Sequence, residues 1–442
     1  MSQKFDDFLA RFVRIEPSEK RAVFTAFALM FCVMGGYFSV RPIRETVGTI
    51  LGEAITSDTW IWTAVFAIAI IPVYGFLVAR VSRATLVPAI YGSVAIALAA
   101  TGVVFRADPQ NMVVGRIFYV GISVINLFLI SVFWSFLLEL FRSEQTKRLF
   151  GFIAAGGTTG ALVGPFVTDR IVNHVGISGI LFFGAAMFFI AIFCQRALLA
   201  EMRAHADLAA AGAAAGDAAR VSRGVGGNPF AGVAIVLKSP YLMGIALFVI
   251  MISTANTILY FEQLRLVKDM FDDPEQRTQM FARIDFIVQT LTVVSQVLIT
   301  GRLAKKLGVT ALLVILPVMI MGGFLILASM GTFLVLATVM ILRRWGEYAF
   351  IRPGREMLWS RLDTETKYKA KNFVDVTVYR FSDAVVAQVQ DGLKAGGMNP
   401  AQAALLGAGV CAAWAVNGWW LGRRFDKEKE PDSGRIASDK SA

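Results

Sequence analysis

The feature that most constrains this chain is a group of charges at the end of its first long apolar run. The run from Ala22 to Val40 is long enough to cross a bilayer, and two arginines and a glutamate follow it, Arg41, Arg44 and Glu45. A charge at bilayer depth costs roughly 2.5–3.5 kcal/mol on insertion scales, so it requires a partner or a wet cavity. Pro42 lacks a backbone donor and favours a break in the helix. We interpret the segment as part of a binding site; the alternative is an arginine pair that extends to the lipid headgroups.

The composition identifies the class of protein. Of the 442 residues, 56% are hydrophobic and only 17% are charged, which is typical of a polytopic helical membrane protein and not of a soluble domain. We therefore predict an all-α membrane protein. The net charge of +11 is expected to lie in positive-inside loops, so it does not indicate nucleic-acid binding.

The apolar segments predict about twelve transmembrane helices of roughly 20 residues each, in two six-helix halves. A cytoplasmic segment (1–21) precedes the first half (22–200), and a linker with an interfacial helix (201–239) precedes the second half (240–424) and a disordered tail (425–442). Lysine and arginine gather in alternate loops, which places both termini in the cytoplasm. The predicted spans are 22–50, 58–79, 84–105, 116–140, 149–171, 177–199, 240–262, 281–301, 308–330, 333–352, 373–391 and 400–421.

A weak internal repeat relates the two halves. Thr146-Lys147 and Thr366-Lys367 occupy corresponding loops, 220 residues apart (366 − 146). Parallel six-helix repeats with a substrate near the bilayer midplane are the arrangement of the major facilitator architecture, which we predict here.

Three glycines recur every four residues in the fifth span, at Gly156, Gly160 and Gly164. Small residues at this spacing allow two membrane helices to pack backbone against backbone. The glycine stripe also resembles the fifth-helix motif of major facilitator exchangers, in which close sliding supports alternating access.

Charged and polar residues recur at membrane depth in the second half. Arg343 and Glu347 are four residues apart and predict an ion pair, which is either structural or a gate. Lys371, Asp375, Tyr379 and Asp383 recur at four-residue intervals, which predicts one polar helix stripe facing a cavity.

Arginine binds carboxylate and phosphate groups bidentately, so we predict an anionic substrate. Dispersed cysteines and two distant histidines indicate no metal site, no cofactor and no enzyme. The candidates for substrate binding are Arg41, Arg44, Asn256, Lys371 and Arg380. The candidates for coupling or gating, with protons as a coupling ion, are Glu45, Glu262, Asp285, Arg343, Glu347, Asp375 and Asp383.

Several of these segments resemble the ATP/ADP translocase family of plastids and intracellular bacteria. Tyr37 to Glu45 is similar to its first-helix motif, and the region from Glu347 to Asp375 is similar to its second charged stretch. The resemblance implies a divergent bacterial member in the inner membrane, with Arg44 and Lys371 as substrate contacts. The family pattern places acidic residues in helices four and seven. The corresponding positions of this sequence lie near Ile122 and Tyr260, which are not acidic.

These observations predict a secondary active transporter that moves an anionic solute across the bilayer by alternating access, with exchange or proton coupling. A nucleotide, or another phosphorylated or carboxylated metabolite, is the expected substrate class. One alternative is proton-coupled transport of an unrelated solute such as a cell-wall fragment, a siderophore or a drug. Another is a membrane receptor or assembly factor that moves nothing.

Overall fold

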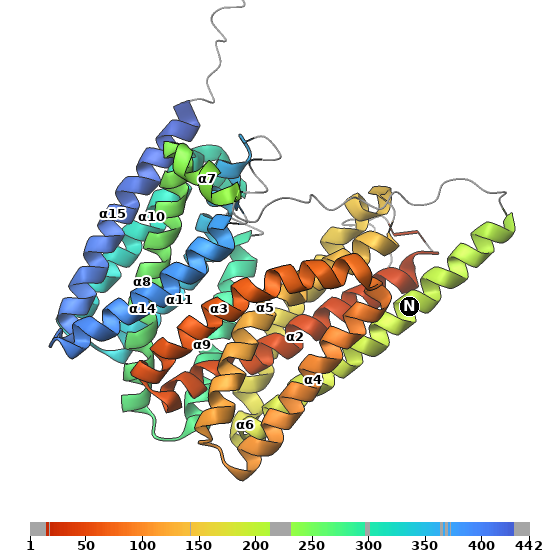
Figure 1. Ribbon diagram of the computed structural model, residues 1–442, viewed down its shortest axis with the longest axis horizontal. Helices are drawn as coiled ribbons and strands as arrows, with labels where there is room; N and C mark the ends of the chain where they lie inside the picture. Colours follow the sequence, from red (N-terminus) through yellow and green to blue (C-terminus); the bar gives the residue numbers. More distant parts are fainter. Residues whose placement is uncertain are drawn as a thin grey trace, which may run out of the picture. The chain divides into compact units, whose positions relative to one another are not determined.

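The computed structural model describes residues 15–16, 18–141, 143–212, 231–296, 301–362, 366, 370–371 and 373–427, and within these ranges it contains helices and no strand (Figure 1). Residues 213–230 of the predicted linker and most of the predicted terminal segments lie outside the described residues. In the first part of the chain the helices are α2 (Lys20–Leu51), α3 (Glu53–Arg80), α4 (Arg83–Ala107), α5 (Met112–Leu140) and α6 (Ser143–Gly212). Then come α7 (Ala231–Lys238), α8 (Pro240–Met270), α9 (Pro274–Ser295), α10 (Gly301–Met330), α11 (Phe333–Gly346), η2 (Glu347–Ile351), α12 (Arg352–Trp359), η3 (Phe373–Val378), α14 (Tyr379–Ala395) and α15 (Pro400–Lys427).

Each predicted span is helical over the residues described, and eight helices in the described ranges are long and apolar enough to cross a membrane. One of them, Arg148–Ala204, contains two predicted spans. A kink at Gly176, which adopts a non-helical conformation with φ of 70°, separates these two spans. The predicted spans that contain α9, η2 and η3 are not among these eight helices, because charged residues lower their hydropathy.

The expectation that Pro42 breaks the first helix is wrong. α2 continues through Pro42 to Leu51, so Arg41, Arg44 and Glu45 are all on one continuous helix. The hydroxyl of Thr46 donates to the Pro42 carbonyl oxygen at 3.3 Å. Proline removes only its own donor, and an interior proline is tolerated in membrane helices.

The contacts divide the chain into two compact units that do not coincide with the predicted sequence halves. Unit 1 is Met1–Leu51, Ala69–Val225 and Phe271–Phe286; unit 2 is Gly52–Ile68, Gly226–Met270 and Ile287–Ala442. The first part of α3 therefore packs in unit 2, and the first part of α9 packs in unit 1. The start of the predicted linker is helical, because α6 continues to Gly212, and a short helix, α7, is present before Pro240. That α7 lies in the membrane interface stays a prediction.

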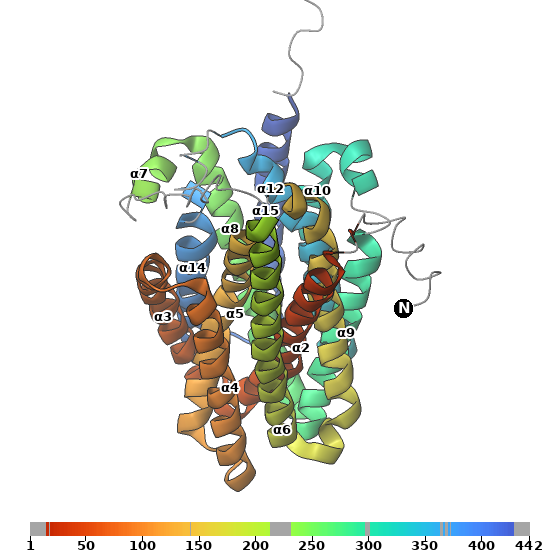
Figure 2. The ribbon, with the colours of Figure 1, turned by 90° about the vertical axis from the view of Figure 1, so that its right-hand side faces the viewer.

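In unit 1 the glycine stripe of α6 lies directly against the backbone of α2, and Figure 2 shows the two helices side by side. A Cβ atom on Gly160 would lie 2.4 Å from the Phe31 carbonyl oxygen and 2.8 Å from the Gly35 nitrogen. Gly156 and Gly164 make similarly close approaches. The packing interpretation of the stripe is confirmed.

Unit 2 is built around an apolar core that α8, α10 and α15 share, with Phe248 and Trp414 at its centre. Asp426, near the end of α15, caps α10 close to its start. Its carboxylate accepts a hydrogen bond from the Thr310 amide at 3.2 Å and another from the Thr310 hydroxyl at 2.7 Å. Residues 425–427, predicted to belong to a disordered tail, are helical, because α15 continues to Lys427; the rest of the predicted tail lies outside the described residues.

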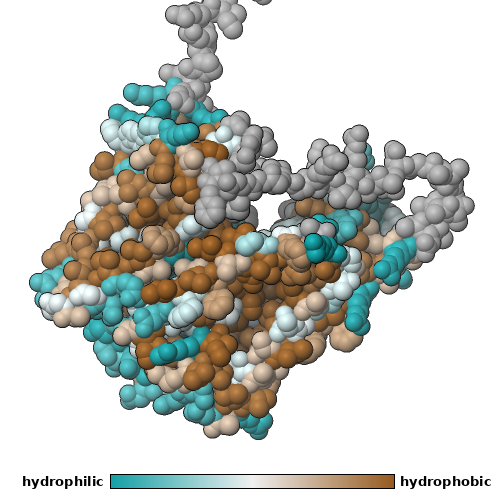
Figure 3. Space-filling view, in the orientation of Figure 1, coloured by the Kyte–Doolittle hydropathy of each residue, from teal (hydrophilic) through white to brown (hydrophobic). Residues whose placement is uncertain are grey.

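Large apolar side chains remain exposed along several helices, and hydrophobic residues cover much of the face seen in Figure 3. Examples are Trp62, Val113, Ile117, Phe193 and Leu334, whose exposures range from 58% to 76%. A soluble monomer rarely presents such continuous apolar surface, whereas a bilayer covers it with acyl chains.

Candidate functional site

In unit 1 the first charged segment of α2 is joined to α9 by an arginine–carboxylate pair. Nη1 of Arg41 donates to both carboxylate oxygens of Asp285 at 2.8 Å each. Only 2% of the Asp285 side chain and 17% of the Arg41 side chain are exposed. Two residues 244 positions apart therefore neutralise each other at a buried site.

Arg44 and Glu45 complete this cluster with two residues of α5. Nη2 of Arg44 lies 2.6 Å from Oε1 of Glu45, and its Nη1 donates to the Ser123 hydroxyl at 3.2 Å. The guanidinium also lies over the Tyr119 ring, 5.3 Å from the ring centroid. We call Arg41, Arg44, Glu45, Tyr119, Ser123 and Asp285 the unit 1 cluster; its two arginines and two carboxylates balance in charge.

The first part of α9 is held in unit 1 by further polar contacts, which fix the position of Asp285. The hydroxyls of Thr46 and Thr278 are 2.7 Å apart, and Arg277 donates to the Thr49 hydroxyl at 3.1 Å. Nearer the end of the same segment, Arg283 forms an ion pair with Asp169 of α6 at 2.7 Å. The carboxylate of Asp285 thus belongs to a segment anchored to both α2 and α6.

In unit 2 a second polar cluster surrounds Arg343. Its Nη1 donates to Oδ1 of Asn256 at 2.5 Å and lies 3.3 Å from Oε2 of Glu347, so the predicted pair of Arg343 and Glu347 is formed. The Asn256 amide nitrogen lies 3.4 Å from the Tyr379 hydroxyl. A guanidinium, a carboxylate, an amide and a phenol from α8, α11, η2 and α14 therefore converge.

Asp383 and Arg380 of α14 extend this cluster along α8. Oδ1 of Asp383 accepts from the Ser253 hydroxyl at 2.5 Å, and Arg380 lies 3.7 Å from its other oxygen. The two side chains are only 14% and 20% exposed. We call Ser253, Asn256, Arg343, Glu347, Tyr379, Arg380 and Asp383 the unit 2 cluster.

The polar stripe predicted from Lys371 to Asp383 is divided in the structure. Lys371 forms an ion pair with Glu356 at 2.6 Å, and Asp375 with Arg355 at 3.3 Å, so both contact α12. Asp383 contacts α8 instead. The π-helical turn η3 (Phe373–Val378) contains Asp375 and lies between Lys371 and Asp383. It has more residues per turn than an α-helix, so a four-residue spacing no longer keeps one face.

Glu262 also lies apart from the unit 2 cluster. Its carboxylate forms an ion pair with Arg265 of the same helix at 2.5 Å, although the residue as a whole is only 8% exposed. The structure therefore gathers five candidates in unit 2, Asn256, Arg343, Glu347, Arg380 and Asp383, and separates Lys371, Asp375 and Glu262 from them. Arg41, Arg44, Glu45 and Asp285 come together in unit 1.

Sequence reasoning missed Tyr119, Ser123 and Ser253. Ser123 is next to Ile122, the apolar position where an acidic residue was expected, and Tyr119 is one turn earlier on α5. Ser253 is one turn before Asn256. A search for hydroxyls within one turn of the candidate positions finds all three, because residues three or four apart share a helix face.

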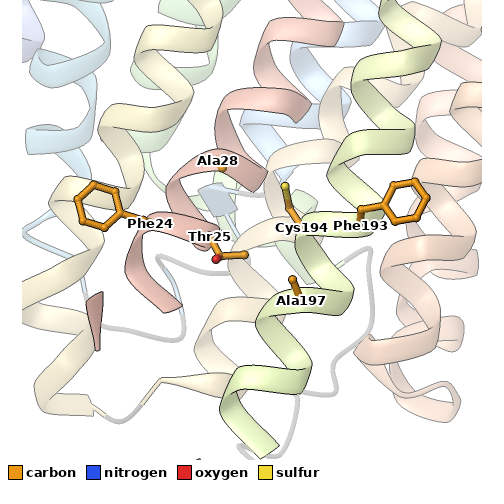
Figure 4. A pocket seen from close by; sticks show the side chains of 6 residues that line it. All are labelled: Phe24, Thr25, Ala28, Phe193, Cys194 and Ala197. Carbon is orange, nitrogen blue, oxygen red and sulfur yellow. The ribbon is translucent and has the colours of Figure 1, made fainter. Parts of the chain in front are cut away.

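An apolar groove of about 430 Å³ lies in unit 1 between α2 and α6, and its lining includes no residue of either cluster (Figure 4). Phe24, Thr25 and Ala28 line it from one helix, and Phe193, Cys194 and Ala197 from the other. This lining offers no cation to an anionic substrate. Among the described residues no group of three or more histidine, cysteine, aspartate or glutamate side chains is arranged to hold a metal ion.

Sequence comparison finds relatives among nucleotide carriers. The chain is 23% identical over 355 residues to ADP,ATP carrier protein 1 of Chlamydia trachomatis, covering 70% of this chain and 65% of that protein. It is 25% identical over 237 residues to ADP,ATP carrier protein 1 of Chlamydia muridarum, covering 47% of this chain and 45% of the relative. The match thus spans between about half and two thirds of the curated relatives. No protein-family model matches the chain.

The chain resembles the ADP,ATP carrier proteins at low sequence identity. Its fold is shared with solved transporters of the major facilitator type. The nucleoside transporter NupG superposes with a TM-score of 0.60 at 15% identity, covering 92% of this chain and 99% of NupG. A POT family transporter in complex with 5-aminolevulinic acid gives 0.62 at 10% identity, covering 92% and 96%. These relatives and neighbours are transporters and not enzymes, and the predicted all-α multi-pass fold is confirmed.

Proposed function

We propose that this relative of the carriers is a secondary active transporter of an anionic solute, a nucleotide or another phosphorylated or carboxylated metabolite, working by alternating access in a bacterial inner membrane. The transporter fold and the ADP,ATP carrier relatives support the class of activity. The anionic substrate rests on the chemistry of the two clusters.

The observation that carries the proposal is the contact between Arg41 and Asp285. The guanidinium already holds a carboxylate with two hydrogen bonds of 2.8 Å in a buried position. A substrate phosphate or carboxylate presents the same arrangement of oxygen atoms to the same donors. An arginine positioned for an internal anion is therefore also positioned for an anion that enters from outside.

The unit 2 cluster supplies complementary chemistry. Arg343 and Arg380 bring positive charge, and Asn256 and Tyr379 bring neutral donors and acceptors that suit the polar edges of a base or a sugar. Glu45, Asp285, Glu347 and Asp383 are the acids that would couple or gate the movement. Lys371 and Asp375 contact α12 instead, so we assign them to a second ion-pair group, while Glu262 pairs within α8.

Thermal unfolding of the purified protein with a panel of anions tests this proposal. A nucleotide present at about a hundred times its dissociation constant should stabilise the folded state by about 2.7 kcal/mol. The variant Arg44→Ala should lose this stabilisation, because Arg44 is held by Ser123 and Tyr119 in an orientation that an anion can use.

Arg106→Ala is the matched control, since Arg106 is an exposed arginine in the last turn of α4. It should keep the full nucleotide response. A panel in which no anion stabilises the protein, or in which Arg44→Ala responds like the parent, would refute the anionic substrate. Uptake of a neutral solute by reconstituted protein would then favour transport of an unrelated solute.

A further inference from the structure

The partner of Asp383 in the unit 2 cluster is a hydroxyl group. The Ser253 hydroxyl donates to Oδ1 at 2.5 Å, whereas the nearest cation, Arg380, lies 3.7 Å from Oδ2. The second distance is longer than a charge-assisted hydrogen bond of about 2.7–2.9 Å. Asp285 in unit 1 differs, since Arg41 donates to both of its oxygens at 2.8 Å.

A hydroxyl partner suits both protonation states of a carboxyl group. It donates its hydrogen to a carboxylate, and it accepts the hydrogen of a carboxylic acid through its own lone pairs. Serine on a helix can then turn its hydrogen toward the carbonyl oxygen one turn earlier. An arginine such as Arg41 offers donors only, so it stabilises the carboxylate and opposes protonation.

The charged and titratable groups around Asp383 come from four elements. α14 itself contributes Tyr379 and Arg380, and α8 contributes the neutral partners Ser253 and Asn256. Arg343 of α11 and Glu347 of η2 act on Asp383 electrostatically and pair with each other at 3.3 Å. Glu347 also lies 3.8 Å from Arg352 of α12, whereas the carboxylate that pairs with Arg380 among the described residues is that of Asp383.

We propose that Asp383 binds a proton together with the substrate anion, which makes the transporter a proton–anion symporter; this inference rests on the proposed function, because it names the ion that accompanies the substrate. One proton adds to a carboxylate oxygen of Asp383, and the resulting acid donates to Ser253. The Arg380–Asp383 pair thereby changes from neutral to one positive charge. That charge attracts the anion, and release of the anion favours release of the proton.

Linkage makes the effect reciprocal and measurable. If a proton strengthens anion binding, the anion must strengthen proton binding by the same factor. Affinity for ATP, the probe chosen here, should therefore rise as pH falls, by at most about tenfold per pH unit for one linked proton. Asp383→Asn copies the protonated acid in shape and charge, so its ATP affinity should lack this contribution and resemble that of the parent at low pH.

ATP binding to purified parent, Asp383→Asn and Asp391→Asn across a pH series tests the linkage. ATP titrates its own phosphates in all three proteins, so the informative quantity is the difference between their pH slopes. Asp391 is on the same helix and outside the unit 2 cluster, and its variant should keep the parental slope. A parental slope in Asp383→Asn would overturn the proposal.

An infrared measurement without any substrate separates failure of this inference from failure of the proposed function. A pH-difference spectrum of the parent should contain the carbonyl stretch of a protonated buried carboxyl, and Asp383→Asn should lack it. Ser253→Ala should shift the frequency of this carbonyl stretch. This variant also tests the proposal if Asp383→Asn does not fold. A band that neither variant changes overturns proton binding at Asp383, whereas absence of ATP binding at every pH counts only against the nucleotide.

Discussion

Gly160 has no room for a single methyl group. Its Cα is so close to α2 that an added Cβ would lie 2.4 Å from a carbonyl oxygen, and backbone atoms cannot move aside as a side chain can. The stripe Gly156, Gly160 and Gly164 was recognisable in the sequence because the spacing of small residues is local. Its partner, the Phe31–Gly35 turn of α2, was not, since nothing in the spacing says which helix packs there.

Gly160→Ala should destabilise the protein by about 1–3 kcal/mol, because an overpacked contact forces the two backbones apart. The measurement is the thermal unfolding midpoint in detergent. Gly151→Ala on the same helix is the control, since no atom lies within 4 Å of the Cβ position there. Equal midpoints for the two variants would contradict the close packing of α6 on α2.

Among the elements, α9 and α14 show what helical spacing can and cannot predict. Asp285 was expected to be a coupling or gating residue, but its contact with Arg41 depends on where the first part of α9 packs. Before and within α14 the four-residue spacing from Lys371 to Asp383 was visible, yet the π-helical turn η3 rotates the later residues toward α8. Hydropathy carries no signal for a π turn, so this division could not be predicted.

The threonine contact that anchors α9 to α2 should be measurable as a coupling energy. Thr46→Val and Thr278→Val each remove one hydroxyl of a buried pair 2.7 Å apart, while retaining side-chain shape. A double-mutant cycle should give an interaction of about 0.5–1.5 kcal/mol.

Thr338→Val supplies the comparison for this cycle. Thr338 is exposed on α11, and its hydroxyl donates to the Leu334 carbonyl oxygen in the same helix. Combined with Thr46→Val it should give an additive effect. A cycle with Thr278→Val that is equally additive would show that the two hydroxyls do not hold α9 in unit 1.

For the whole molecule, the length of the apolar runs was sufficient to predict the helices, and the lysine and arginine pattern was sufficient to predict an orientation. Both follow from the bilayer, which acts on each segment separately. The grouping into units was not predictable in the same way, because the first parts of α3 and α9 each pack away from the rest of their sequence half. The unit in which such a segment packs depends on contacts between residues that are far apart in the sequence.

The predicted topology leads to a labelling experiment on intact cells. Cys194 is first replaced by serine, since the native Cys32 and Cys411 are buried. Thr332→Cys, in the exposed turn between α10 and α11, should react with a membrane-impermeant thiol reagent added outside. Arg223→Cys in the predicted cytoplasmic linker should react only after permeabilisation. The reverse pattern would invert the orientation.

The carboxylate of Asp285 competes with any solute anion for the guanidinium of Arg41. A solute that binds Arg41 must first displace a carboxylate already in place, so its apparent dissociation constant is the intrinsic one divided by the fraction of molecules in which the pair is open. Weak apparent binding suits a carrier, because a tightly held cargo dissociates slowly and lengthens every cycle. Evolution toward tighter binding at this arginine would therefore reduce the rate of delivery.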